Sequence, residues 1–321
     1  MIKPEDVEFH TPLNNDFRWC ETNPFLFNIP EHRISGVLYV VTRPVLGVCM
    51  SDITVQDRFS QVWEEQLYID NQQHLPCPKS LSQYELPNGL AVRVIEPLKH
   101  YHAHYEGIDD TRIDLEFKAL MDPFDMNDPA QDPSAAGRLG HGWSHAFGGH
   151  FEITGRVTGE AILRGKPYKI DCIDTLDRSW GPRQERDNAN VIWLHGSFGE
   201  RLTVHALVAF DPVKSAAFGP LISGYVLEDG RVYGMTAVEG RTERHGLYPM
   251  STVLQATDTR GKTFKLTAAA MNCAPWAPYP SVLYVQALMR WNHEGAIGYG
   301  VQQDVVSRAY ATRHRDAIRN L

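Results

Sequence analysis

Residues 223–238 read SGYVLEDGRVYGMTAV. Two runs rich in β-branched and aromatic residues flank Asp229-Gly230, a dipeptide that favours the type I′ turn of a β-hairpin. Residues 82–95, SQYELPNGLAVRVI, repeat this pattern around Asn88-Gly89. Type I′ turns match the twist of the strands they join, so both segments predict antiparallel hairpins.

The same pattern continues outward in both directions along the chain. Short apolar or alternating runs recur at roughly 8–12-residue spacing, without helical segments between them. They cover residues 36–41, 91–95, 112–120, 147–157, 167–173, 190–198, 202–210, 221–227, 231–238, 263–268, 281–291 and 296–301. No G-x-G-x-x-G follows a strand and no P-loop pattern occurs, which disfavours the phosphate-binding α/β folds. We therefore predict an all-β protein of antiparallel sandwiches or barrels, with one C-terminal helix over residues 304–321.

Composition and charge narrow the class of protein. The 321 residues are 43% hydrophobic and 22% charged, which is ordinary globular usage and long enough for two domains. The formal charge of −8 disfavours nucleic acid as a partner, because phosphate contacts need a basic surface. Five scattered cysteines form no CxxC pair, and no apolar run has the length of a signal peptide or membrane span. We expect a soluble cytoplasmic protein without a disulfide framework; self-association stays open.

A break in the pattern covers residues 121–140, MDPFDMNDPAQDPSAAGRLG. Its prolines, glycines and acidic residues predict a long surface loop, and whether it acts as a lid stays open at this stage. We place two β-domains around it, at residues 1–150 and 151–321. A site near their junction is expected, because ligand pockets favour such places.

Three histidines, His100, His102 and His104, alternate along a predicted strand. They would project from one face, an arrangement that suits a metal ion, but a strand with a polar face explains them equally simply. A second group reads Gly140-His-Gly-Trp-Ser-His145 and then Gly149-His-Phe-Glu152. Its histidines could serve as acid–base groups or bond to the backbone of a tight loop.

The densest group of functional side chains is DTLDRSWGPR, residues 174–183. Arginine can hold a carboxylate in a bidentate fork, and a charged group is costly to bury unless it is paired. Such a cluster either orients a catalytic aspartate or pins a loop, with Trp180 as an apolar plug. Spacing alone does not choose between these interpretations.

The order of G-H-F-E-x-x-G-x-V-x-G (149–159), a hairpin and D-x-x-D-R-S-W-G-P-R (174–183) resembles the hydroxyneurosporene synthase family. This family includes carotenoid 1,2-hydratases and the related AttH-like proteins. The resemblance extends loosely from about residue 35 to the end. It implies two consecutive lipocalin-like antiparallel β-barrels with an apolar cavity near their interface. It also implies chemistry on isoprenoid or polyketide-like molecules, although His141, His145 and the acidic loop before them have no counterpart in that pattern.

Addition or loss of water at a hydrophobic alkene passes through carbocation character. It needs a carboxylic acid that stays protonated near neutral pH, apolar walls and aromatic faces. Asp177 is the best candidate for this acid and Asp174 the second, provided that Arg178 and Arg183 point elsewhere. His145 or His150 would position water or accept a proton. The candidates for substrate contact are Trp143, Trp180, Trp193, Tyr225 and Arg183.

The function predicted is thus acid–base hydration, dehydration or isomerisation of a hydrophobic, isoprenoid-like molecule, without a cofactor. One alternative is a carrier that binds such a molecule without changing it, as small barrels do. The other is a metal-dependent enzyme that uses His100, His102 and His104.

Overall fold

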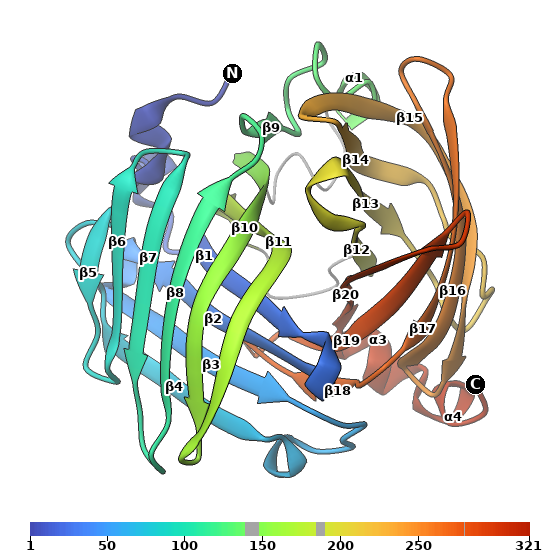
Figure 1. Ribbon diagram of the computed structural model, residues 1–321. Coiled ribbons are helices and arrows are strands. Elements are labelled where there is room, and N and C mark those ends of the chain that lie inside the picture. The colour runs from blue at the N-terminus through green and yellow to red at the C-terminus, as the bar shows by residue number, and fades with distance from the viewer. Residues whose placement is uncertain (139–147, 184–189, 279) are drawn as a thin grey trace.

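The computed structural model describes residues 1–138, 148–183, 190–278 and 280–321 (Figure 1). Its first antiparallel sheet has eleven strands, in the order β4-β3-β2-β1-β11-β10-β8-β7-β6-β5, with β9 paired to β10. In chain order these are β1 (Trp19–Ile29), β2 (Ile34–Arg43), β3 (Val48–Gln56), β4 (Tyr68–Pro76), β5 (Gln83–Glu85), β6 (Leu90–Glu96), β7 (His100–Glu106), β8 (Arg112–Ala119), β9 (Phe124–Asp125), β10 (Gly149–Leu163) and β11 (Lys166–Pro182).

The second sheet has nine strands, in the order β17-β16-β15-β14-β13-β12-β20-β19-β18. A further antiparallel pairing of β17 with β19 closes eight of them into a barrel. The strands are β12 (Val191–Ser197), β13 (Leu202–Ala209), β14 (Leu221–Glu228), β15 (Arg231–His245), β16 (Tyr248–Asp258), β17 (Thr263–Ala270), β18 (Ala274–Trp276), β19 (Val282–His293) and β20 (Ala296–Ser307).

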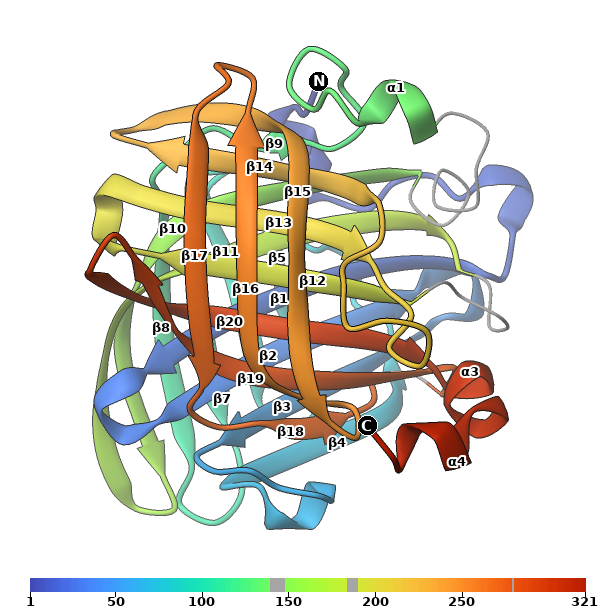
Figure 2. The ribbon, with the colours of Figure 1, turned by 90° about the vertical axis from the view of Figure 1, so that its right-hand side faces the viewer.

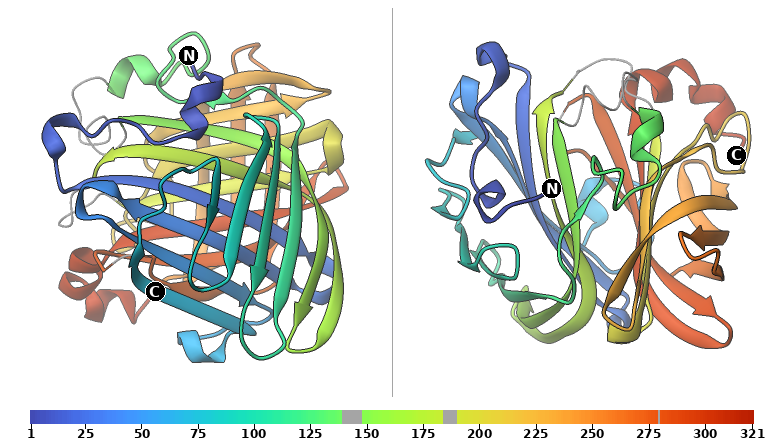
Figure 3. Two further views of the ribbon diagram at one scale, coloured as in Figure 1. Left: turned by 90° about the vertical axis from the view of Figure 1, so that its left-hand side faces the viewer. Right: turned by 90° about the horizontal axis from the view of Figure 1, so that it is seen from above.

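The predicted fold class is confirmed: the chain is nearly all β and builds two consecutive barrel-like units (Figures 1 and 2). The first unit is a strongly curved half-barrel, whereas the second is closed. Seen from above, the half-barrel and the closed barrel stand side by side (Figure 3). The expected division at residues 150/151 falls at the start of β10, while the change from one sheet to the other comes between β11 and β12.

Three apolar clusters hold this arrangement together. One fills the inner face of the half-barrel and includes Phe27, Leu38 and Phe151. A second fills the closed barrel. The third lies between the two units, where Tyr39 of β2 meets Trp276 of β18 at 5.4 Å between ring centroids. We call this third cluster the inter-sheet core.

The inter-sheet core explains why β1 and β2 are buried along their whole length. Their two faces pack against different apolar clusters, so their sequences read as nearly continuous apolar runs. Strand β7 covers only one core, and its burial therefore alternates residue by residue.

The two predicted hairpin turns differ. Asp229 and Gly230 have φ values of 48° and 76°, and two positive values in succession are what the predicted type I′ turn requires. At the other hairpin only Gly89 is left-handed, and its amide bonds to the carbonyl of Leu86. The type I′ prediction is wrong here because Pro87 fixes a negative φ one residue earlier in the turn.

Helices are short in the part of the chain that the structure describes. They are α1 (Ala135–Arg138), α3 (Arg308–Arg313) and α4 (Arg315–Ile318), with single 3₁₀ turns at 4–7, 13–15, 30–32, 44–46, 63–65 and 199–201. The C-terminal helix is confirmed, but it begins at Arg308 and not at residue 304, because β20 continues to Ser307. No helix in these described ranges is long and apolar enough to cross a membrane.

The stretch predicted as a surface loop is more firmly packed than its composition indicated. Phe124 and Met126 are buried, and β9 adds Phe124–Asp125 to the first sheet. Asp132 is fully buried and accepts a hydrogen bond of 2.6 Å from Ser223 Oγ of β14. Residues 121–138 thus tie the two units together; residues 139 and 140 lie outside the described ranges.

Candidate functional site

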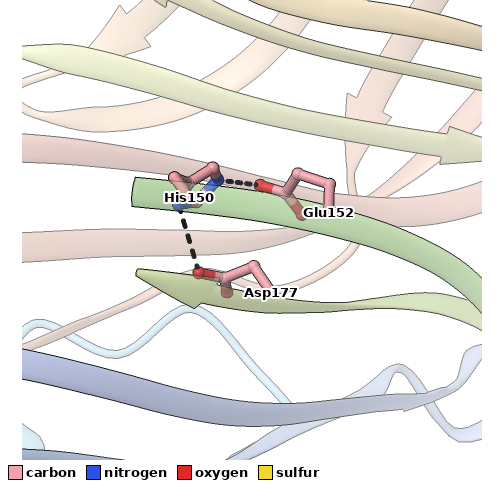
Figure 4. A group of neighbouring side chains, drawn as sticks. All are labelled: His150, Glu152 and Asp177. Atoms are coloured by element: carbon pink, nitrogen blue, oxygen red, sulfur yellow. Dashed lines mark hydrogen bonds and ion pairs between the residues drawn. The ribbon is translucent and has the colours of Figure 1, made fainter. Parts of the chain in front are cut away.

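Three titratable side chains come together on neighbouring strands: His150 and Glu152 of β10 and Asp177 of β11 (Figure 4). Glu152 lies directly opposite Asp177 in the antiparallel pairing, and His150 lies opposite Ser179. Because side chains alternate between the faces of a sheet, all three project toward the second barrel. His150 Nε2 lies 3.0 Å from Glu152 Oε1, and its Nδ1 lies 3.8 Å from Asp177 Oδ2. We call these three residues the acid–base cluster.

Glu152 is buried and is satisfied by groups from both sheets. Trp193 Nε1 of β12 donates to its Oε1 at 2.8 Å, and Thr175 Oγ1 of β11 donates to its Oε2 at 3.0 Å. His205 Nε2 of β13 lies 3.4 Å from Oε1. Burial alone would raise the pKa of Glu152, but His205 and His150 outweigh it and hold this pKa well below its usual range. Glu152 is therefore an ionised hydrogen-bond acceptor.

Asp177 has the opposite electrostatic environment. Its side chain is only 17% exposed, and burial, followed by the neighbouring negative charge of Glu152, raises its pKa to about 7. The positive charges of His150, Arg183 and Arg178 act in the other direction but do not cancel these effects. Asp177 is thus a carboxyl group that can hold a proton near neutral pH.

The two arginines of the DTLDRSWGPR segment do not occupy the same face. Arg178 points away from Asp177 and pairs with the buried Glu21 at 3.1 Å, while donating to the carbonyl of Val7 at 2.7 Å. Arg183 donates to Ser179 Oγ at 2.6 Å, on the side of the sheet that carries Asp177. Arg178 is therefore a buried structural ion pair, and Arg183 lies at the edge of the acid–base cluster.

Aromatic and histidine side chains of the second barrel form a wall behind Glu152. The ring of His205 stacks on Tyr225 of β14 at 5.0 Å and meets Trp193 edge-on at 4.8 Å. Tyr225 Oη and Thr154 Oγ1 are hydrogen-bonded at 2.7 Å, which joins β14 to β10. Next to His205, burial and the charge of His205 lower the pKa of His195 to about 3. His195 is therefore a neutral member of this wall.

Two of the residues predicted for the site lie on the opposite face of β11. Asp174 is fully buried and accepts a hydrogen bond of 2.8 Å from Asn28 Nδ2; burial raises its pKa to about 6. Trp180 stacks on His10 at 3.7 Å and fills the space beside Gly149. A Cβ at Gly149 would come within 2.0 Å of the Trp180 ring, so this glycine is needed for close packing. Both residues are removed from the acid–base cluster.

The structure therefore brings together four of the predicted site residues: Asp177, His150, Trp193 and Tyr225, with Arg183 beside them. His145 and Trp143 lie outside the described residues. Glu152, His195 and His205 were missed. Alternation offered one signal for Glu152, because it lies two residues after His150 in the quoted G-H-F-E motif and must share its face. His205 sits within an apolar strand, LTVHALVA, and only tertiary contacts reveal its partner.

His100, His102 and His104 do not gather around one point. They project from β7 on its partly exposed face, where His102 and His104 bond to Asp114 at 3.1 and 2.9 Å, and His100 faces Glu116 at 3.3 Å. Within the described ranges, the group with metal-binding geometry is instead the acid–base cluster, whose ligand atoms lie within 4.8 Å of one another. A metal enzyme based on the β7 histidines has no geometric support.

Beside the acid–base cluster lies the inter-sheet core. Trp193 belongs to both, because its Nε1 bonds to Glu152 while its ring packs in this core. Gln303 and Val305 of β20 face the same way and stay partly exposed, although β20 is paired on both sides. The space between the sheets therefore admits solvent beside apolar and aromatic walls. A separate cavity of about 320 Å³ lies between residues 121–131 and the β14–β15 turn, and no residue of the cluster lines it.

The chain belongs to a family described as a domain of unknown function, DUF7064, whose model matches residues 3–303. No curated protein matches the sequence. Among solved structures, an AttH candidate from Nitrosomonas europaea aligns with a TM-score of 0.59 at 14% identity, covering 95% of this chain and 96% of that one. Kievitone hydratase from Nectria haematococca aligns with a TM-score of 0.52 at 10% identity, covering 91% and 89%. These likenesses confirm the AttH-like fold; membership of the hydroxyneurosporene synthase family stays a prediction.

Proposed function

We propose that this chain is an acid–base enzyme that adds water to, removes water from or isomerises a hydrophobic, isoprenoid-like molecule between its two β units. The observation that carries the proposal is the pair formed by Glu152 and Asp177. They are cross-strand neighbours, yet one is held ionised and the other is held near its protonation midpoint at neutral pH. Environments that separate the pKa values of two neighbouring carboxyl groups are typical of acid–base catalysis.

His150 connects the two carboxyl groups. A carboxylate can only accept, so His150 carries its hydrogen on Nε2, where it donates to Glu152 at 3.0 Å. This tautomer leaves Nδ1 as a proton acceptor facing Asp177. Glu152 therefore orients His150 and stabilises its protonated form, which is a positioning role.

In the hydration direction, Asp177 donates its proton to one carbon of an alkene. The π electrons form the new C–H bond and leave positive charge on the neighbouring carbon. A water oxygen bonds to that carbon, and its proton passes to Nδ1 of His150. The proton then returns to the Asp177 carboxylate, 3.8 Å away, and the cycle is complete. Dehydration runs the same steps backward, and isomerisation loses a different proton from the cation.

The surroundings suit such an intermediate. Aromatic rings stabilise positive charge through their faces, and the inter-sheet core offers Trp193 next to the acid–base cluster and Tyr39 and Trp276 further along. Apolar walls also favour a hydrophobic substrate. The likeness of the fold to an AttH candidate and to a hydratase supports this choice of reaction class without naming the substrate.

The test is turnover of a panel of terpenoid, steroid and polyketide alkenes and tertiary alcohols in H₂¹⁸O, read by mass spectrometry. We expect ¹⁸O incorporation by the native chain, and a loss of about 10²–10⁴-fold in kcat for Asp177→Asn and for His150→Gln. Asp174→Asn, in the same strand but on the other face, is the matched control and should retain activity.

If ligands bind but none is converted, and binding is unchanged in Asp177→Asn, the chain is a carrier. If activity requires a stoichiometric metal that is lost in His150→Gln, the acid–base mechanism is wrong.

A further inference from the structure

A second buried acid lies on the same face of the first sheet as Asp177. Asp52 of β3 is only 1% exposed, and its Oδ1 accepts a hydrogen bond from Asn71 Nδ2. Its Oδ2 is buried and has no partner among the described residues. A buried polar atom without a partner costs about 1–3 kcal/mol, so such an atom calls for an explanation.

The strand registers place Asp52 and Asp177 in one row across the sheet. Asp52 is paired with Tyr39, and Tyr39 with Pro24 of β1. The β1–β11 pairing ends at Thr22 opposite Ser179, and continuing its register by two residues brings Pro24 beside Asp177. The two acids are therefore three strand spacings apart, about 14 Å.

Proline explains why the ladder stops between them. Pro24 has no N–H to donate, so β1 and β11 lose a hydrogen bond at the middle of the row. The side chains of Tyr39 and Met50 on this face belong to the inter-sheet core. Asp52 thus faces the same apolar region between the sheets that the acid–base cluster borders.

Two more unsatisfied polar atoms lie around Asp52. Tyr39, its cross-strand neighbour, contacts the ring of Trp276, whose Nε1 is buried without a partner in the described ranges. Gln66 Nε2 donates to the carbonyl of Pro275, next to Trp276, while Gln66 Oε1 has no described partner either. One indole donor and two oxygens are therefore left unsatisfied in a wall that is otherwise apolar.

We propose that Asp52 and Trp276 form a polar subsite for a hydroxyl group of the substrate, at the end of the inter-sheet region opposite the acid–base cluster. The ligand class that this defines is an elongated apolar or aromatic molecule with a hydroxyl about 14 Å from its reacting carbon. The assignment of the reacting end rests on the proposed function, whereas binding at Asp52 is measured without turnover.

A hydroxyl group fits because it both donates and accepts. Burial, together with the nearby charge of Asp70, raises the pKa of Asp52 to about 8, so its carboxyl is largely protonated at pH 7 and donates. At higher pH the same group becomes an acceptor for the hydroxyl hydrogen. Either state leaves the ligand oxygen free to accept from the Trp276 N–H.

The experiment compares trans-4-hydroxystilbene with trans-stilbene, two fluorescent probes that differ only in one hydroxyl. We expect the native chain to bind the hydroxylated probe about tenfold more tightly, as one well-placed buried hydrogen bond allows. Asp52→Leu should abolish this preference while binding trans-stilbene at least as tightly, which also shows that the variant is folded. Asp114→Asn, which removes a carboxyl from the exposed part of the same sheet, should keep the preference.

Equal binding of the two probes by the native chain, or no binding of either, would overturn the subsite, as would a preference that survives in Asp52→Leu. In these cases the unsatisfied atoms are occupied by fixed water only. A lost preference in Asp52→Leu combined with an inactive native chain would keep the subsite and reject the proposed reaction. Turnover with no hydroxyl preference would do the reverse.

Discussion

Glu152 and Asp177 face each other across the β10–β11 pairing, yet their pKa values are displaced in opposite directions. The difference arises from what else each carboxyl group meets. Glu152 receives hydrogen bonds from Trp193 and Thr175 and the charge of His205, whereas Asp177 meets chiefly an apolar environment and the charge of Glu152 itself. The ionised group thus helps to keep its neighbour protonated.

The alkaline side of the pH–rate profile should report Asp177. Its proton is required for the first step, so kcat/KM for hydration should fall about tenfold per pH unit above pH 7, where the carboxyl ionises. The measurement is initial rate between pH 5.5 and 9. An unchanged rate up to pH 9 would contradict the role of Asp177 as the acid.

Glu152→Gln should lower kcat and also move that alkaline limb. The glutamine keeps the shape but removes the negative charge that raises the pKa of Asp177, so the limb should shift to lower pH. The free energy of unfolding should fall by about 2 kcal/mol, because Trp193 and Thr175 lose a charged acceptor. A residue with a purely structural role would reduce stability and leave the pH profile in place.

His195 should contribute a pH dependence to folding. Its pKa is about 3 in the folded chain and near 6.5 when unfolded, so below pH 6.5 only the unfolded chain takes up the proton. Its contribution to stability therefore falls with decreasing pH, by about 1.4 kcal/mol per pH unit between pH 6 and pH 4. Urea unfolding of the native chain and His195→Gln over this range checks it; parallel slopes in both would count against a neutral buried His195.

The stack of His10, Trp180 and Gly149 should affect stability without affecting the reaction. Gly149→Ala places a methyl group against the Trp180 ring and should cost about 1–3 kcal/mol of unfolding free energy. Trp180→Phe should leave KM for a hydrophobic substrate within about twofold, since Trp180 faces away from the acid–base cluster. A rise in KM of tenfold or more would return Trp180 to the substrate site.

A matched pair of variants separates the two aromatic walls. Trp193→Phe keeps the ring in the inter-sheet core but removes the N–H that donates to Glu152. We expect a loss in kcat larger than that of Tyr284→Phe, a change in the same core without contact to the cluster. Equal effects of both changes, measured under saturating substrate, would indicate general packing and no role of the indole N–H.

Local patterns predicted the all-β class, the Asp229-Gly230 turn and the site residues His150 and Asp177. Those features depend on alternation and turn chemistry, which neighbouring residues carry. The end of β20 was misplaced because the apolar residues Val305 and Val306 fit a helical stripe as well as a strand, and the pairing with β19 decides between them. Glu152, His205 and Asp52 obtain their properties from strands far away in sequence, so no local pattern reveals them.

Strand β1 pairs with β2 on one side and with β11 on the other. The centre of the first sheet therefore joins the start of the chain to residues near 180, and this contact cannot form during synthesis until β11 has left the ribosome. Until then β1 and β8 present open edges, which are sites for pairing with other chains. We therefore expect a chain ended after residue 150 to aggregate, and native folding to be slow and governed by this late strand insertion.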